Sequence, residues 1–115
     1  MTSYINTGLA IDPATTRNGC LQVFPGSHKL GYLGLSDAAD GTIMKGLTHD
    51  QELLQAGLDP ACKVNLELEP GDLALWGLLA VHGSVGNTSQ QDRAFAIQSW
   101  TKPLRGASPM HLRKM

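Results

Sequence analysis

This chain of 115 residues has no excess of charge of either sign. Nine Lys and Arg residues against ten Asp and Glu residues give a formal net charge of −1, and no basic stripe is present. Proteins that bind nucleic acid or anionic membranes use clustered positive charge. We therefore expect neither nucleic acid nor a membrane as a partner.

Long apolar segments are also missing. No run approaches the ~18 residues that are needed to cross a bilayer. The first twenty residues have no basic n-region, no continuous apolar core and no small-residue cleavage site, so no signal peptide is predicted. The sequence therefore predicts a cytoplasmic protein.

Cysteine is scarce, and neither cysteine belongs to a Cys-x-x-Cys motif. Cys20 and Cys62 lie far apart, which leaves a disulfide, a metal site or simple burial as roles. Free cysteine is among the most buried residue types, and a reducing cytosol disfavours disulfides. We expect buried thiols.

The residues that are present are those of one folded domain. Hydrophobic residues make up 42% and charged residues 17%, both near the globular average. Thirteen Gly and six Pro are spread along the chain without a repeat or a low-complexity segment. They divide it into short pieces, which favour strands.

Alternation of apolar and polar residues predicts where those strands lie. In 64–69, Val64, Leu66 and Leu68 share one face, which is the period of a half-buried strand. Pro-Gly-Asp then turns the chain into a second strand. The strands predicted in this way are 4–11, 20–24, 64–69, 73–76 and 93–101.

One short helix is predicted between these strands. Thr48 can cap it, Gln51 completes a capping-box pattern, and Gly57 ends it, with 49–56 as the body. Several short strands, frequent turns and one inserted helix near 49–56 predict a mostly β protein with an antiparallel sandwich or barrel.

Among four histidines, His82 has the most suggestive context. An apolar run precedes His82 and a glycine-rich stretch follows it. Arg93 begins the next predicted strand, eleven positions later. A turn between Gly86 and Gln91 would bring both side chains to one end of the sheet. A neutral imidazole for a divalent metal and an arginine fork for a carboxylate would then share a pocket.

The segment NGCLQVFPGSHK, residues 18–29, resembles the NGxLxVxPGSHK segment of the phytanoyl-CoA dioxygenase family, which are iron(II)- and 2-oxoglutarate-dependent oxygenases. Pro-Gly-Asp-Leu at 70–73, His-Gly-Ser at 82–84, Asn87 and Arg93 follow in the family's order and approximate spacing. The resemblance implies a double-stranded β-helix, a jelly-roll or cupin-like barrel, with about the last six of eight core strands present. It implies a domain over 1–102, incomplete at its N-terminus, and a tail over 103–115.

The resemblance also implies roles for single residues. His82 matches the distal iron-ligating histidine, and Arg93 matches the arginine that pairs with the distal carboxylate of 2-oxoglutarate. Ser84 matches a hydroxyl that can hydrogen-bond the same carboxylate. Asn87 is interpreted as a turn former rather than a cofactor contact, because Asn bonds its own backbone.

The PGSHK segment allows two interpretations. His28 and Lys29 could face a substrate at the mouth of the pocket. We favour the alternative, in which Pro25 and Gly26 fix a turn while Ser27 and His28 satisfy backbone groups.

Two expected metal ligands are missing. In the family they form a His-x-Asp pair on an upstream strand, and no His-x-Asp or His-x-Glu occurs in this sequence. His49 and Asp50 are adjacent, so on a helix their side chains point roughly 100° apart and cannot substitute. The chain therefore offers one of the three ligands of a two-histidine, one-carboxylate site for iron(II).

Three explanations remain open. The chain is a fragment of a longer oxygenase, a shortened relative that has lost catalysis, or one member of a pair in which a second chain supplies the missing ligands. Missing strands would leave unpaired sheet edges, and symmetric pairing would cover them, so we expect a homodimer.

Two main functions follow. The first is a dioxygenase-like domain that uses iron(II) and 2-oxoglutarate on a small organic substrate and is catalytically incomplete on its own. The second is a non-catalytic binding or assembly module of the same fold. A cupin-like metal protein of different chemistry is a third possibility, because one fold hosts many functions.

Overall fold

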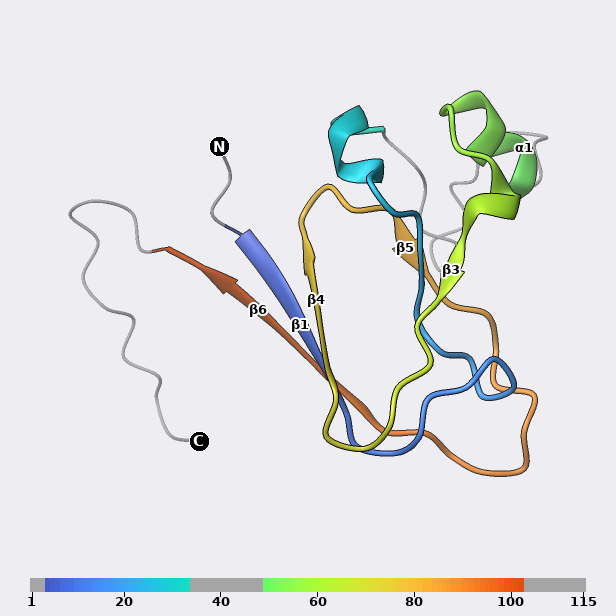
Figure 1. Ribbon diagram of the computed structural model, residues 1–115, viewed down its shortest axis with the longest axis vertical. Helices are drawn as coiled ribbons and strands as arrows, with labels where there is room; N and C mark the ends of the chain where they lie inside the picture. Colours follow the sequence, from blue (N-terminus) through green and yellow to red (C-terminus); the bar gives the residue numbers. More distant parts are fainter. Residues whose placement is uncertain (1–3, 34–48, 103–115) are drawn as a thin grey trace.

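The computed structural model describes residues 4–33 and 49–102 and contains two three-stranded antiparallel sheets (Figure 1). The strands are β1 (Tyr4–Ala10), β2 (Gln22–Val23), β3 (Val64–Asn65), β4 (Leu73–Gly77), β5 (His82–Gly83) and β6 (Phe95–Thr101). The larger sheet has the order β4-β1-β6 and the smaller one β3-β2-β5. The mostly β prediction is confirmed, and over the described residues the two sheets do not close into a barrel.

The larger sheet has β1 at its centre. This strand pairs with β4 from Ile5↔Gly77 to Leu9↔Leu73, and with β6 from Tyr4↔Thr101 to Ala10↔Phe95. Its three strands match the segments predicted over 4–11, 73–76 and 93–101. The match follows from period-2 alternation, which these strands carry within themselves.

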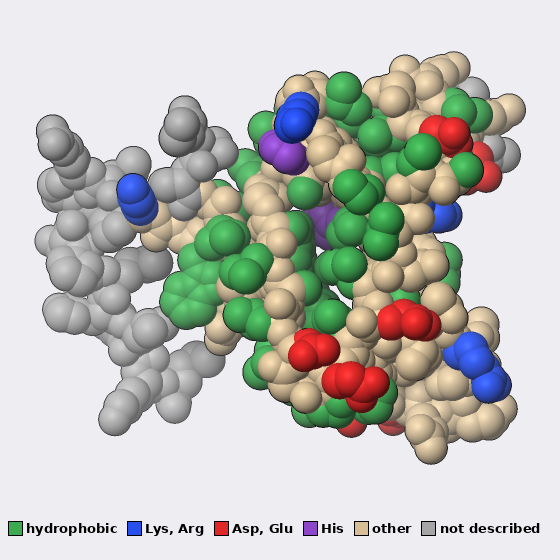
Figure 2. Space-filling model, in the orientation of Figure 1, with side chains coloured by type: hydrophobic (Ala, Val, Ile, Leu, Met, Phe, Trp, Pro, Cys, Tyr) green, Lys and Arg blue, Asp and Glu red, His purple; other side chains and the backbone are tan. Residues whose placement is uncertain are grey.

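The two faces of the larger sheet differ in burial. Residues paired directly across antiparallel strands point to the same side. On the inner side, Ala74 and Trp76 join Leu21 in the core. The outer side exposes Ile5, Leu9, Leu73, Leu75 and Trp100. Figure 2 shows hydrophobic side chains gathered over this sheet.

The smaller sheet joins the two motifs that the sequence singled out. Val23 of β2 pairs with Val64 of β3 on one side and with His82 of β5 on the other. The strand after the Asn-Gly pair and the strand of the His-Gly-Ser motif are therefore neighbours.

The predictions of strands over 20–24 and 64–69 are too long. Only Gln22–Val23 and Val64–Asn65 form a ladder. Beyond it, the amide of Leu66 donates to the Leu21 carbonyl at 2.8 Å, and Leu68 pairs with Ala14 through an isolated bridge. The partner of this segment is interrupted by a turn after Ala14, so the ladder cannot continue.

The helix α1 (His49–Gln55), the one α-helix among the described residues, confirms the helix predicted near 49–56. Two residues after its end, Gly57 has a left-handed φ of 88°, and the amide of Leu58 donates to the Leu53 carbonyl at 2.8 Å. The predicted cap, Thr48, lies outside the described residues. Two 3-10 helices, η1 (Ser27–Leu30) and η2 (Pro60–Cys62), complete the structure. Within the described ranges, no helix has the length and apolar character of a membrane span.

The two cysteines differ in environment, and both are free thiols. Cys20 is 2% exposed, as expected, and its burial raises the pKa of the thiol, with the charge of Glu67 adding to the effect. The expected burial of Cys62 is wrong, because this residue ends the surface helix η2 and is exposed.

Candidate functional site

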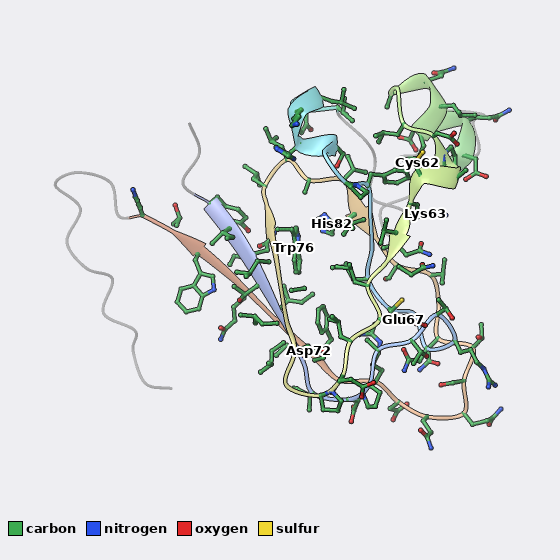
Figure 3. The ribbon with its side chains drawn as sticks, in the orientation of Figure 1. Cys62, Lys63, Glu67, Asp72, Trp76 and His82 are labelled. Atoms are coloured by element: carbon green, nitrogen blue, oxygen red, sulfur yellow. The ribbon has the colours of Figure 1, made fainter. Side chains whose placement is uncertain are left out.

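His82 stands at the start of β5, and its ring is fixed on two sides. The imidazole Nδ1 lies 2.8 Å from the Ala80 carbonyl oxygen. The ring centroid lies 5.3 Å from that of Trp76, with the planes tilted by 55°. Both side chains lie between β4 and the smaller sheet (Figure 3).

The contact with Ala80 determines which nitrogen of His82 can bind a metal. A carbonyl oxygen only accepts hydrogen bonds, so Nδ1 carries the proton and donates it. Whenever the ring is neutral, Nε2 therefore carries the lone pair. Metal-ligating histidines commonly have this arrangement, with the other ring nitrogen donating to a backbone carbonyl.

His82 and Ser84 line the same cavity, of about 190 Å³. One wall comes from β2 with Gln22, and another comes from α1 with Asp50 and Glu52. The structure therefore brings two of the three predicted site residues together. The sequence interpretation rejected Asp50 as a metal ligand and did not consider Glu52, because nothing local indicates that the inserted helix lines a cavity with β5.

Arg93 occupies a separate position, just before β6. Its Nε donates to the Asn18 carbonyl at 3.1 Å and its Nη2 to the Gly19 carbonyl at 2.8 Å. The guanidinium lies over the Phe95 ring, 5.5 Å from the centroid. Arg93 does not line the cavity of His82 and Ser84, but its two acceptors begin the segment that continues into β2.

The connection from His82 to Arg93 crosses between the sheets, because β5 belongs to the smaller sheet and β6 to the larger. Asn87 shapes this connection. Its Oδ1 accepts hydrogen bonds from the amide and hydroxyl of Ser89, and its Nδ2 donates to the Gln91 carbonyl at 2.7 Å. The interpretation of Asn87 as a turn former is confirmed.

The PGSHK segment contacts the residue that precedes β5. Ser27 is 3% exposed, and its Oγ accepts a hydrogen bond from the Val81 amide at 2.8 Å. Gly26 has a left-handed φ of 77°, as the favoured turn interpretation requires. In turn, the Phe24 amide donates to the Val81 carbonyl at 3.0 Å. Both backbone groups of Val81, the residue before His82, are thus hydrogen-bonded, one to Ser27 and the other to Phe24, which directly precedes the PGSHK segment.

A larger cleft of about 590 Å³ lies on the other side of Trp76. Its lining is mostly apolar and includes Phe24, Leu66 and Leu75, while the side chain of His28 stands in its wall. Figure 2 shows a hollow lined by hydrophobic side chains at the centre of this face. Sequence reasoning missed Trp76, although its place six residues before His82 on an inward-facing position was a usable signal.

The residues fit the implied iron site in part. His82 offers an oriented imidazole with a free lone pair on Nε2. Over the described residues, however, no group of three or more His, Cys, Asp or Glu side chains could hold a metal ion. The described part of the chain therefore supplies one ligand of the three that a facial iron site uses.

A family model described as Phytanoyl-CoA dioxygenase (PhyH) matches residues 2–95. A Phytanoyl-CoA dioxygenase domain-containing protein 1 homolog from Caenorhabditis elegans is 33% identical over 95 residues, which are 74% of this chain and 30% of the relative. The dioxygenase lolE1 of Epichloe uncinata is 32% identical over 91 residues, or 79% of this chain and 30% of that protein. The chain thus spans about a third of the length of the curated relatives it matches.

Solved structures give the same fold. The crystal structure of EvdMO1 matches with a TM-score of 0.62 and 25% identity, over 89% of this chain and 20% of that chain. EctD from S. alaskensis, solved with bound Fe, matches with a TM-score of 0.56 and 23% identity, over 85% of this chain and 31% of that chain. These likenesses confirm the predicted double-stranded β-helix fold class, although the described strands form two open sheets.

Proposed function

The chain belongs to the phytanoyl-CoA dioxygenase family, and on this premise we propose that it forms the distal-histidine side of an iron(II)- and 2-oxoglutarate-dependent oxygenase site. The observation that carries the proposal is the state of His82. Nδ1 donates its proton to the Ala80 carbonyl, so Nε2 is the ring nitrogen that can bind a metal.

Each of the three site residues has a stated role in this proposal. His82 holds the metal through Nε2. Arg93 and Ser84 hold the distal carboxylate of 2-oxoglutarate, since a guanidinium fork and a hydroxyl both donate to carboxylate oxygens. When bound, iron(II) with 2-oxoglutarate supplies the activation of dioxygen for oxidation of a small organic substrate.

The contacts of Arg93 fix its orientation, although Arg93 does not line the cavity of His82 and Ser84. Two of its N–H groups are spent on the Asn18 and Gly19 carbonyls, which fixes the plane of the guanidinium before any ligand arrives. Five N–H donors are available in this group, so the rest of the fork remains for a carboxylate. A fixed donor loses less conformational entropy on binding than a mobile one.

We further propose that the chain is catalytically incomplete on its own. One imidazole is a third of the protein ligand set for iron in this kind of site. The remaining ligands would come from a longer polypeptide or from a second chain.

The site assignment can be tested by titrating the isotopically labelled chain with Mn²⁺ and recording NMR spectra. Paramagnetic broadening is expected to centre on His82 and Ser84 and to be lost in His82→Ala. His28→Ala is the matched control, since His28 lines the other cleft, and it should leave the pattern unchanged. Broadening centred on His28, or unchanged in His82→Ala, would remove His82 from the metal site.

A second candidate function is assembly with another copy of the chain. The outer side of the larger sheet exposes Leu75 to 60% and Trp100 to 54%. None of the outward-facing strand positions carries a charge, namely Ile5, Thr7, Leu9, Leu73, Leu75, Gly77, Ala96, Gln98 and Trp100. An uncharged apolar face can meet its own copy without like-charge repulsion, and closed dimers are the commonest homo-oligomers.

Sedimentation of the purified chain at micromolar concentration tests this second function. A homodimer is expected, and Leu75→Glu should convert it to a monomer, because it places a charge in the middle of the apolar face. Leu78→Glu is the matched control, since Leu78 is similarly exposed but follows β4. A monomeric parent chain would end the dimer proposal and leave the site proposal standing.

A further inference from the structure

The two tryptophans of the chain differ in what their indole N–H groups contact. Nε1 of Trp100 donates to the Thr7 hydroxyl at 3.0 Å on the outer side of the larger sheet. Trp76 is 8% exposed, and its Nε1 is buried without a hydrogen-bond partner. Across residues 4–33 and 49–102, no other buried side-chain nitrogen or oxygen lacks one.

Packing of the core alone does not explain why position 76 has a buried N–H group without an acceptor. A buried donor without an acceptor loses its hydration and gains nothing in return, so most such groups in folded proteins are paired. Phenylalanine at position 76 would bring a ring to the same core without this loss. The indole therefore carries a donor that the described part of the chain does not use.

The surroundings of Trp76 define what could use the donor. Its indole lines the 590 Å³ cleft, where only Tyr4, His28 and Trp76 among the described lining residues have polar side-chain atoms. The hydroxyl of Tyr4 already donates to Ser99 at 2.7 Å. His28 is exposed, and it does not accept a hydrogen bond from the buried indole.

We propose that Nε1–H of Trp76 is the hydrogen-bond donor of a ligand site in this cleft, and that the ligand is a neutral, largely apolar molecule with a carbonyl group. Apolar walls favour an apolar body. A carbonyl accepts the one buried hydrogen bond on offer and brings no donor of its own. A carboxylate is disfavoured, because burying a charge requires a partner and none of the described residues that line the cleft is Lys or Arg.

Nε1 of Trp76 is closed to solvent, so a ligand in the cleft reaches it only where the cleft wall moves aside. Leu78, Leu79 and Ala80 form part of the cleft wall, and Leu78 is 50% exposed. An exposed side chain changes rotamer at little cost, so this wall can yield to a ligand that reaches the indole. The same wall ends at the Ala80 carbonyl that holds His82, which places the bound molecule beside the proposed metal ligand.

The experiment follows the two indole N–H resonances of the ¹⁵N-labelled chain by NMR, without iron. Trp76→Phe and Trp100→Phe assign them. The chain is titrated with 2-hexanone and, in parallel, with 2-methyl-1-hexene, which has the same shape but no acceptor. The ketone is expected to move the Trp76 indole proton downfield, as a new hydrogen bond does, while the alkene leaves it near its starting position and Trp100 serves as the internal control.

The variant gives a second readout. In Trp76→Phe, backbone amide shifts should report an affinity for the ketone that is lower by roughly tenfold, which is about 1.4 kcal/mol, with the affinity for the alkene unchanged. A Trp76 indole resonance that does not respond to the ketone would overturn the proposal, since water would then be its partner. Equal affinities of parent and variant for the ketone would overturn it as well. If Trp76→Phe does not fold, the comparison of ketone and alkene on the parent chain still decides the matter.

Discussion

At the scale of single residues, His82 is set in place by groups from three parts of the chain. The Ala80 carbonyl fixes its proton, the Trp76 ring lies against it, and β2 pairs with it through Val23. Ser27 adds a fourth support one residue earlier, by holding the Val81 amide. The imidazole is thus oriented before any metal binds.

The Ser27 hydroxyl should matter for stability although it touches no ligand. In Ser27→Ala the buried Val81 amide loses its acceptor, so we expect the free energy of unfolding to fall by about 1–3 kcal/mol. Urea denaturation followed by tryptophan fluorescence measures this. Ser84→Ala, at an exposed serine, should change the free energy by less than about 0.5 kcal/mol. Equal losses in both variants would contradict the assigned role of Ser27.

Arg93 should not be replaceable by lysine. Arg93→Lys keeps the charge but loses the two-pronged geometry toward the Asn18 and Gly19 carbonyls and toward a carboxylate. We expect weaker binding of 2-oxoglutarate, measured by calorimetry on a preparation that binds it. Arg17→Lys makes the same chemical change at an exposed position and should leave the affinity unchanged. The same affinity in Arg93→Lys as in the parent would remove Arg93 from the site.

The two cysteines should react differently with iodoacetamide. Burial raises the pKa of the Cys20 thiol, so at pH 8 both the reactive thiolate and access to it are scarce. Cys62 is exposed. Mass spectrometry of the native chain should find one alkylation, at Cys62, and none in Cys62→Ser, with Cys20 reacting only in denaturant. Two alkylations of the native chain would contradict the packing around Cys20.

At the scale of elements, the strands differ in how well their own sequence predicts their length. β1 and β6 alternate over their whole length and were predicted within a residue or two. The segment 64–69 alternates just as clearly, yet only Val64–Asn65 forms a strand, because its length depends on a partner interrupted by a turn. Periodicity in the sequence predicts which segments can form a strand. The length over which a segment forms a ladder depends on its partner strand.

The centre of the larger sheet depends on a close approach between Gly8 and Phe95. A Cβ at position 8 would collide with the Phe95 ring, so Gly8→Ala should displace that ring from the core. We expect a loss of about 1–3 kcal/mol in the free energy of unfolding, measured by urea denaturation.

Gly77→Ala is the control for this strand position. Nothing lies within 4 Å of a Cβ built at Gly77, and its backbone does not have a positive φ. The substitution should be neutral or nearly so. A Gly8→Ala variant as stable as Gly77→Ala would show that the sheet accommodates a side chain at this point.

At the scale of the whole molecule, the site was predictable where its residues are neighbours in sequence and not where they meet through folding. His82 and Ser84 share a cavity largely because they are only two residues apart, His82 at the start of β5 and Ser84 directly after its end. The contact of Ser27 with Val81 spans 54 positions, and no local pattern marks it. The unpartnered indole of Trp76 is likewise a property of packing, since a sequence shows a donor but not the absence of its acceptor.

The central claim is that this chain carries the His82 side of an oxygenase site and needs further ligands for catalysis. The most direct test is anaerobic titration of the purified chain with iron(II) and 2-oxoglutarate, followed by admission of oxygen and assay of succinate. The account predicts no visible charge-transfer band of a bound iron–2-oxoglutarate chelate and no release of succinate. A clear band with succinate release from the chain alone would contradict it, and would mean that the described residues and their neighbours complete the iron site unaided.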